Sequence, residues 1–405
     1  HTLNHYANEG FYFITSDAGE GKKIQDVTIT PPSGNEIVNV NEFTDYQVHE
    51  VEKLNLAKTG KVFYGESFEN TTSYDFNFDF PNITSADIKA RVDVAAISSE
   101  NSTFELKLND VQEKSLTVLK KSSDNYEIGK DANVTLTFPN ANSTPKVEFT
   151  LSYSKPTLSS RGYLNYLEVN ARRKLVMIGS VLFFRNADNV NTSGYKRFQI
   201  SGAAANVQVW DVTDPANVKR ITATRTGDVL EFVDSGESLK QYVALDPTSK
   251  ASFTLEPASA VTVPNQNIHG LPAAEMVIIT HPNFISQAEK LANAHRQKDN
   301  LRVHVFTTEQ VYNEFSSGTP DASAYRWVMK MFYDRALAAG DQSLMPKYLL
   351  LFGRGSYDNR GIINNSGDNL VITYQADMSL DIVKSYVTDD YFGFLDDKEG
   401  LYPPS

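Results

Sequence analysis

The chain has 405 residues, 40% of them apolar and including 23 Phe and 20 Tyr, so it is long enough for two or three domains with large buried cores. Its net charge of −12 argues against nucleic acid or an anionic membrane surface as the main partner, because phosphates are bound by clustered Lys and Arg. The absence of Cys excludes disulfides, thiolate zinc sites and a cysteine nucleophile within these residues.

The start of the chain carries no targeting or membrane signal. No run of about 18 apolar residues predicts a spanning helix, and no signal peptide precedes the first strand pattern. The chain begins with His1 and not Met, so we expect its start to be processed or trimmed. Residues 1–61 are interpreted as an N-terminal segment that is rich in β-structure.

Residues 62 to 257 have the period-two alternation of half-buried strands. The alternation recurs with turn residues between the segments, at 73–80, 90–94, 103–108, 134–138, 147–153, 163–169, 207–212 and 229–233. Strands at this spacing predict a β-sandwich over residues 62–190. Residues 191–263 are a second β unit or a continuation of the first, with the boundary near 186–193.

The pattern changes at residues 264–272 and becomes that of an alternating α/β domain. Short apolar runs predict buried parallel strands at 276–280, 302–306 and 347–352. Apolar residues at helical spacing predict helices at 285–298 and 323–339, the second capped by Asp321. A further strand candidate is 386–394. The predicted fold class is multidomain: an all-β, sandwich-like region followed by the first part of an α/β/α domain over residues 264–405.

An α/β domain with three or four strands has an open edge and an uncovered sheet face. We therefore expect residues 264–405 to pack against polypeptide that continues them.

Two loops of the α/β half invite a functional interpretation. The segment Phe352-Gly-Arg-Gly-Ser356 follows a strand, where α/β proteins place ligands, but it lacks the Gly-Lys-Ser/Thr of a phosphate loop. A tight turn that needs two glycines is favoured over the rim of a cleft. Asp389, Asp390, Asp396, Asp397 and Glu399 have oxygen ligands for calcium, but a solvated acidic turn is favoured because the spacing is not that of an EF-hand.

The histidines do not form a recognisable catalytic or metal set. His1 and His5 have the spacing of zinc ligands on a helix but lack a helical pattern, so fraying is favoured. His281 follows a strand at the functional edge of the sheet, and a structural role is favoured for it. No Ser-His-Asp set can be assembled from the sequence.

Four segments of the α/β half resemble the catalytic domain of gingipain-family cysteine peptidases. In order, they are 274–284, 307–321, 348–358 and 386–393, within a resemblance that covers residues 271–400. In detail they are more similar to the surface sortase of the type IX secretion system than to a secreted gingipain.

The resemblance implies a caspase-like α/β/α fold and a Cys-His peptidase. Its His and Cys follow later strands of the domain, and neither motif occurs here, so no catalytic residue, cofactor-binding residue or established metal ligand is assigned to this chain. Relatives often have Asp where this chain has Arg354, and that Asp can bind calcium. The departure puts a structural calcium at that point in doubt, although one remains possible elsewhere.

The resemblance also implies a function at the cell surface. The full-length protein would remove the C-terminal signal domain from exported cargo and join the cargo to an anionic lipopolysaccharide anchor at the outer membrane. Its partners would be the outer-membrane β-barrel protein PorV and other components of an attachment complex. This chain alone is expected to be inactive.

Two other functions stay open. One is a secreted endopeptidase with gingipain chemistry. The other is a non-catalytic surface module that binds carbohydrate or a partner through aromatic residues such as Tyr163, Tyr166 and Trp210, although core packing is the favoured role for these side chains. A downstream His and Cys would favour an enzyme, and hydrolysis without transfer to an amine would favour the endopeptidase.

Overall fold

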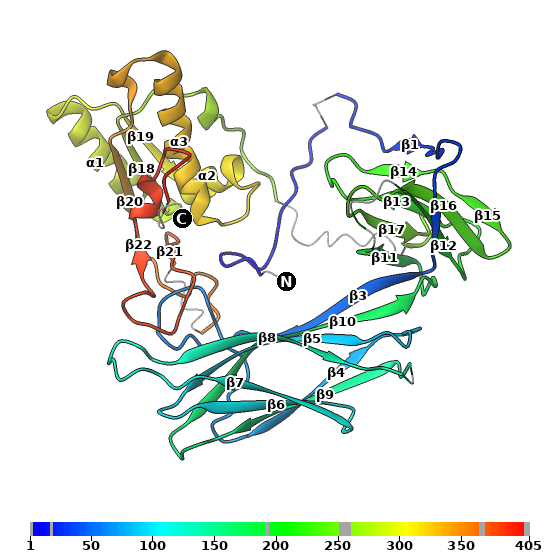
Figure 1. The fold of residues 1–405 in the computed structure, drawn as a ribbon. Coiled ribbons are helices and arrows are strands. Elements are labelled where there is room, and N and C mark those ends of the chain that lie inside the picture. The colour runs from blue at the N-terminus through cyan, green and yellow to red at the C-terminus, as the bar shows by residue number, and fades with distance from the viewer. Residues whose placement is uncertain are drawn as a thin grey trace.

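The structure is a computed structural model that describes residues 3–16, 19–141, 143–188, 190, 194–250, 261–363 and 369–400. Over these residues the chain forms a β-sandwich, a second β unit and an α/β unit (Figure 1). In the view of Figure 1 the sandwich lies at the bottom, the second β unit at the upper right and the α/β unit at the upper left. None of the helices in these ranges is long and apolar enough to cross a membrane.

The β-sandwich consists of two antiparallel four-stranded sheets in the described part of the chain. One sheet has the order β3 (Glu42–Glu50), β10 (Arg161–Lys174), β5 (Ile88–Ile97) and β8 (Lys130–Phe138). The other has the order β4 (Ser73–Asp79), β9 (Lys146–Ser154), β6 (Ser102–Leu108) and β7 (Gln112–Val118).

Phenylalanines fill the core between these two sheets. In β4 the side chains of Phe76 and Phe78 are buried while those of Asp75 and Asn77 are exposed, which is the alternation that the sequence predicted. The largest fully buried side chains of the core are Phe68, Phe80, Phe104, Phe138 and Phe149. Their burial is the main favourable term for this unit.

The second β unit also has two sheets among the residues described. Its five-stranded sheet has the order β1 (Gln25–Val27), β14 (Lys219–Ile221), β13 (Gln208–Asp211), β17 (Gln241–Leu245) and β11 (Val181–Arg185). Its four-stranded sheet has the order β15 (Thr224–Thr226), β16 (Val229–Ser235), β12 (Tyr195–Ile200) and β2 (Ile37–Val40). An aromatic cluster of Phe184, Phe198, Phe232 and Tyr242 lies at the centre of this unit's core.

The N-terminal segment contributes to every unit. Strand β1 pairs with β14 and β2 pairs with β12, both in parallel, and β3 pairs antiparallel with β10 in the sandwich. Ahead of them, the half-buried Tyr6 packs against the core of the α/β unit. The topology therefore divides the expected segment 1–61 among the three units, and it places β11, expected within the sandwich range 62–190, in the second β unit.

The α/β unit has a parallel sheet of order β19 (Val303–Thr307), β18 (Met276–Thr280), β20 (Tyr348–Phe352). Its helices are α1 (Ile285–Lys298), α2 (Thr308–Phe315) and α3 (Ala322–Ala339), with single 3-10 turns at Ile268–Gly270, Pro282–Phe284 and Gln342–Leu344. All five residues of β18 are buried, as expected for a central parallel strand. Asp321 caps α3 by accepting a hydrogen bond from the Ser323 amide (2.7 Å), as predicted.

These elements confirm the predicted fold class, but the last strand candidate differs from the prediction. Within 386–394 the structure has only the two-residue strand β22 (Val387–Thr388), paired with β21 (Tyr374–Gln375), and a 3-10 turn at Asp390–Gly393. Phe392 is buried against the α/β core and ring-packs with Tyr325 of α3. The apolar residues of this segment therefore anchor a turn to the α/β core. Their spacing resembles that of a strand, which is why the sequence predicted one.

The sandwich and the α/β unit meet along a seam, in which residues 54–64 and 126–129 lie against residues 374–386. Backbone hydrogen bonds cross it, from the Lys61 amide to the Ala376 carbonyl (2.9 Å) and from the Ile128 amide to the Leu380 carbonyl (2.8 Å). The Gly60 amide also donates to the side chain of Gln375 (3.0 Å).

Gly60 permits the closest approach at this seam. It has a φ of +81°, and an added Cβ would lie 2.0 Å from the Met378 carbonyl oxygen and 2.6 Å from the Ser379 hydroxyl. No side chain can occupy that space without displacing backbone. Gly60 is thus required both for its conformation and for the contact between the units.

We predict that Gly60→Ala destabilises the chain more than Gly227→Ala. Gly227 also has a positive φ (+62°), but an added Cβ there would meet nothing within 4 Å. In both variants backbone strain should lower the free energy of unfolding by roughly 1 kcal/mol. In Gly60→Ala overpacking should lower it by roughly 2 kcal/mol more. Urea unfolding of both variants measures the difference. Equal losses would show that the seam adapts to a methyl group.

Candidate functional site

The carboxyl ends of the three parallel strands meet at one edge of the α/β sheet, which is where such sheets place functional groups. Thr280, at the end of β18, is fully buried, and its hydroxyl donates to the Phe352 carbonyl at the end of β20 (2.9 Å). Thr307, at the end of β19, forms a reciprocal capping box with Gln310 at the start of α2. Side-chain hydrogen bonds therefore fix the geometry of this edge.

His281 lies at the same edge and has a structural contact. Its Nδ1 accepts a hydrogen bond from the Asn283 amide (3.2 Å) and so caps the 3-10 turn Pro282–Phe284. Its ring meets the edge of Phe284, which in turn meets Phe352 of β20. The arrangement agrees with the structural role favoured for His281. The His281 side chain stabilises the turn that precedes α1.

The glycine loop after β20 is a tightly packed wall of this edge. An added Cβ at Gly355 would lie 2.6 Å from both the Val371 carbonyl oxygen and the Thr373 methyl carbon, and one at Gly353 would lie 3.1 Å from Val371. The Thr373 hydroxyl donates to the Ser356 carbonyl (2.9 Å). Both glycines are needed because residues 369–373 lie directly against the loop, which supports the tight turn over a phosphate loop.

A buried carboxylate completes the loop. Asp358 is 5% exposed and accepts hydrogen bonds from the backbone amides of Ile362 (2.7 Å) and Ile363 (2.8 Å). The Arg354 carbonyl accepts from the Leu370 amide (2.8 Å), so Arg354 takes part in the loop through its backbone. Asp358 thus serves the backbone of the loop, a role that no local sequence pattern indicated.

The acidic residues near the end of the described chain make turn and surface contacts. Asp397 forms an ion pair with Lys330 of α3 (2.8 Å), which lowers the pKa of the Asp397 carboxyl. Glu399 accepts a hydrogen bond from the Asp396 amide (3.1 Å), and Asp389 precedes the 3-10 turn without capping it. Among the residues described, no group of three or more His, Cys, Asp or Glu has an arrangement that could hold a metal ion.

His5 lies in a cavity between the N-terminal segment and the sandwich region, and His1 lies outside the described residues. The cavity has a volume of about 150 Å³ and is lined by Leu3, His5, Glu50, Glu52, Lys61, Val62, Phe63, Asn165 and Tyr166. Burial lowers the pKa of His5, and the positive charges of Lys61 and Arg360 act in the same direction. His5 is thus held against the sandwich region, whereas the sequence favoured a frayed terminus.

A buried ion pair beside this cavity joins the sandwich to the α/β unit. Arg360 of the α/β unit contacts Glu52, and their side chains are only 7% and 12% exposed. Arg360 also donates to the side chain of Asn8 (3.3 Å) in the N-terminal segment. The two partners of the ion pair are 308 residues apart. Sequence reasoning missed this cluster because no local pattern connects its members.

Glu50 is the titratable group that this arrangement perturbs most clearly. Burial raises its pKa to about 7 from an ordinary 4.5, and the neighbouring charges of Glu52 and Asp93 act in the same direction, while Arg360 opposes them. The folded chain therefore holds a proton on Glu50 more tightly than the unfolded chain does. Its contribution to stability is fully present below about pH 4.5 and is lost as the pH rises through about 7.

We predict that Glu50→Gln flattens the pH dependence of stability between about pH 4.5 and 7 and raises the stability of the chain at higher pH relative to wild type. The control is Glu9→Gln, which removes the same charge from an exposed position of the N-terminal segment. Urea unfolding at several pH values measures the effect. If the two variants have the same pH profile, Glu50 does not titrate in this window.

The aromatic residues considered for a binding module are divided between two units. Tyr163 of β10 is 4% exposed and packs against Tyr64, and the Tyr166 hydroxyl accepts a hydrogen bond from Asn133 (2.8 Å). Trp210 lies in β13 of the second β unit and donates from its indole to Gln208 (3.1 Å). Tyr163 thus has the packing role favoured for it, while Tyr166 and Trp210 are half-buried.

The described edge of the sheet is thus a rigid frame of caps, close-packed glycines and a backbone-binding carboxylate. It contains no thiol because the chain has no Cys, and its one histidine binds backbone. The frame can position a substrate segment or neighbouring catalytic loops. It has no nucleophile and base of its own.

Comparison with known proteins shows what this frame is similar to. Residues 269–403 match peptidase family C25. No curated protein matches the chain. The crystal structure of dimeric latent PorU from Porphyromonas gingivalis matches with 27% identity and a TM-score of 0.79, over 93% of this chain and 36% of PorU. The chain therefore spans little more than a third of that protein, and the resemblance to gingipain-family peptidases is confirmed.

Two carbohydrate-binding modules also match parts of the chain, with TM-scores too low to carry an argument. One is the CBM36-1 domain of a multidomain xylanase from the hindgut metagenome of Trinervitermes trinervoides, with 11% identity over 31% of this chain and 96% of that one (TM-score 0.21). The other is module CBM36 in complex with calcium and xylotriose, with 15% identity over 29% of this chain and 99% of that one (TM-score 0.19).

Proposed function

We propose that this chain is the N-terminal part of a cell-surface cysteine peptidase that acts as a sortase. Its residues 269–403 match peptidase family C25, and its fold is similar to that of the matching part of PorU. The observation that carries the proposal is the extent of the match. It covers 93% of the chain, and so includes the β-sandwich and the second β unit as well as the start of the peptidase domain.

The reaction we propose is transpeptidation by a Cys-His pair in later parts of the peptidase domain. The thiolate attacks the carbonyl carbon of the scissile peptide bond, and the leaving amine departs with a proton from the histidine. This step gives a thioester. An acceptor amine then attacks the thioester, passes its proton to the histidine and restores the thiolate, so that a new amide replaces the old one.

The substrate we propose is an exported cargo protein with a C-terminal signal domain, and the acceptor is an amine of a lipopolysaccharide anchor. Removing the signal domain and joining the cargo to the anchor would occur in one active site at the outer-membrane surface. A closed site would favour the amine over water as the nucleophile.

The contribution of this chain is to build and orient the carboxyl edge of the sheet. The capped strand ends and the glycine loop fix that edge, and the seam at Gly60 ties it to the sandwich. The sandwich and second β unit are then held next to the peptidase domain, where they can engage cargo or other proteins.

We predict that the whole protein cleaves a cargo that carries a C-terminal signal domain and transfers it to an added primary amine. Mass spectrometry of the new carboxyl end measures the ratio of amide to free acid. Alkylation of the thiol should abolish both products. The chain of residues 1–405 by itself should give neither product, because it contains no Cys.

The possible results separate the alternatives. Free acid alone, with no amide at high amine concentration, contradicts the sortase and supports a secreted endopeptidase. Alkylation-sensitive turnover by residues 1–405 alone would contradict the assignment of catalysis to later residues. No turnover by the whole protein would contradict the peptidase itself and leave a binding module.

We also propose that the whole protein is tethered at the outer membrane by another protein, the β-barrel PorV, within an attachment complex. The charge of −12 on this chain makes direct adhesion to an anionic lipopolysaccharide surface unfavourable, which supports a protein tether.

We predict that the whole protein leaves the membrane fraction when the barrel protein is deleted. Cell fractionation at low and high salt, with and without the barrel, measures its location. A charge-mediated attachment would be lost at high salt in both strains. Retention on the membrane at high salt without the barrel would contradict the tether.

A further inference from the structure

Lys196 is a buried cation at a position where the strand pattern requires an apolar residue. In β12 the inward residues are Lys196, Phe198 and Ile200, and Lys196 is only 5% exposed. Phe198 and Ile200 belong to the core of the second β unit. Lysine is almost never buried to this extent unless it is paired with an anion.

The contacts of the Lys196 ammonium are with neutral oxygens. Its Nζ donates to the side-chain oxygen of Asn186 (3.1 Å) and to the backbone carbonyl of Asp188 (2.5 Å). Within the described part of the chain, no carboxylate lies within ion-pair distance of it. Burial lowers its pKa, although the charge of Asp188 opposes that effect. An ammonium has three donors, so one N–H of Lys196 has no protein acceptor among these residues.

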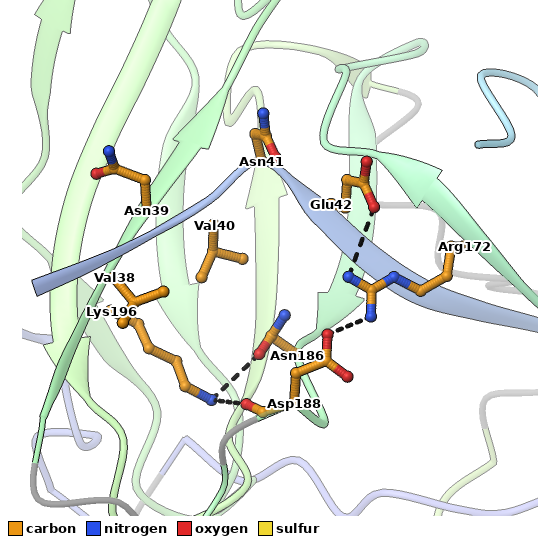
Figure 2. Close-up of a pocket in the computed structure, with 9 residues that line it drawn as sticks. All are labelled: Val38, Asn39, Val40, Asn41, Glu42, Arg172, Asn186, Asp188 and Lys196. Carbon is orange, nitrogen blue, oxygen red and sulfur yellow. Dashed lines mark hydrogen bonds and ion pairs between the residues drawn. The ribbon is translucent and has the colours of Figure 1, made fainter. Parts of the chain in front are cut away.

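This ammonium faces a small polar cavity between the second β unit and the sandwich (Figure 2). The cavity has a volume of about 110 Å³. It is lined by Val38, Asn39, Val40, Asn41, Glu42, Arg172, Asn186, Asp188 and Lys196. The space corresponds to roughly three or four water molecules, which is the size of a small anion with a few heavy atoms.

A second cationic donor in the lining is also unused. The Arg172 guanidinium forms ion pairs with Asp188 and with Glu42, the latter at 3.5 Å (Figure 2). Its Nε is buried and, among the residues that the structure describes, has no hydrogen-bond partner. The two carboxylates of the lining are thus directed to the terminal nitrogens of Arg172. The groups that still need a partner, Lys196 Nζ and Arg172 Nε, are both donors.

We propose that this cavity is a binding site for a small oxyanion of the size of a carboxylate or an inorganic phosphate. Such a ligand supplies an acceptor oxygen to the Lys196 ammonium, and a charge-assisted hydrogen bond from Lys is a common way to bind it. Asn39, Asn41 and Asn186 add amide groups around it. The formal charges of the lining sum to zero, so the attraction for an anion comes from the local position of the Lys196 ammonium and an anion of low charge fits best.

A purely structural role for Lys196 explains the position less well. A buried lysine without an ion pair destabilises a core, and an apolar residue of similar length would fit the strand pattern better. Residues 38–42 also carry the chain from the second β unit into the sandwich, so a bound anion would contact both units.

The test is a calorimetric titration of the chain with sodium acetate and with sodium phosphate, using sodium chloride at matched ionic strength as the reference. Acetate represents carboxylates, and phosphate represents tetrahedral oxyanions. We expect saturable binding of at least one of them at millimolar concentration. Binding of acetate alone, of phosphate alone or of both identifies the preferred class.

The variant Lys196→Met should weaken that binding by roughly tenfold or more, because it removes a charge-assisted hydrogen bond. The matched control is Lys219→Met, which removes the same charge from an exposed position of the same β unit and should leave binding unchanged. Circular dichroism checks the fold of both variants. Without added anion, Lys196→Met should melt at a higher temperature than wild type, since a buried charge is removed.

The proposal is overturned if neither acetate nor phosphate binds more than chloride does. It is also overturned if the two lysine variants lose binding equally, because that result would indicate general charge screening. A lower melting temperature of Lys196→Met, with anion binding unchanged, would assign Lys196 a structural role only.

Discussion

The contact between Gly60 and the Met378 carbonyl is the constraint on which the arrangement of this protein depends. No atom larger than hydrogen fits there, so the backbone of the sandwich loop lies directly against the backbone of the α/β segment. The hydrogen bonds of Lys61 and Gly60 across the seam require that approach. Because the seam fixes segment 374–386, it also fixes the glycine loop, which packs against residues 369–373 just before it.

The N-terminal segment makes the three units interdependent. Tyr6 packs on the α/β core, while β1 and β2 complete sheets in the second β unit and β3 completes one in the sandwich. These contacts join residues that are far apart in sequence, so they close large loops, which is entropically costly. No unit is therefore complete without this segment, although each unit has its own aromatic core.

Buried charges occur at the junctions between units as well as within them, where Asp234 of β16 is 1% and Asp358 of the glycine loop 5% exposed. Arg360 pairs with Glu52 where the sandwich meets the α/β unit, and Lys196 faces the cavity where the second β unit meets the sandwich. Junctions can hold such groups because their surfaces are less closely packed than a core and retain polar neighbours. They are consequently the places where pH or a small ligand can act on the relation between units. The carboxyl edge of the α/β sheet is fixed by its own caps.

The sequence by itself determined the local elements of this protein. Period-two alternation located the sandwich strands, the apolar runs at 276–280 and 347–352 located parallel strands, and Asp321 marked the start of α3, because each signal is read from neighbouring residues. The glycines at 353 and 355 indicated a tight turn for the same reason. Only the tertiary structure decided which unit each strand joined, why 386–394 forms a turn, and that Glu50, Glu52 and Arg360 share one cluster. These outcomes depend on partners that are far apart in sequence, such as Glu52 and Arg360, which are 308 residues apart. Folding brings such residues together, and no pattern of neighbouring residues indicates their contact.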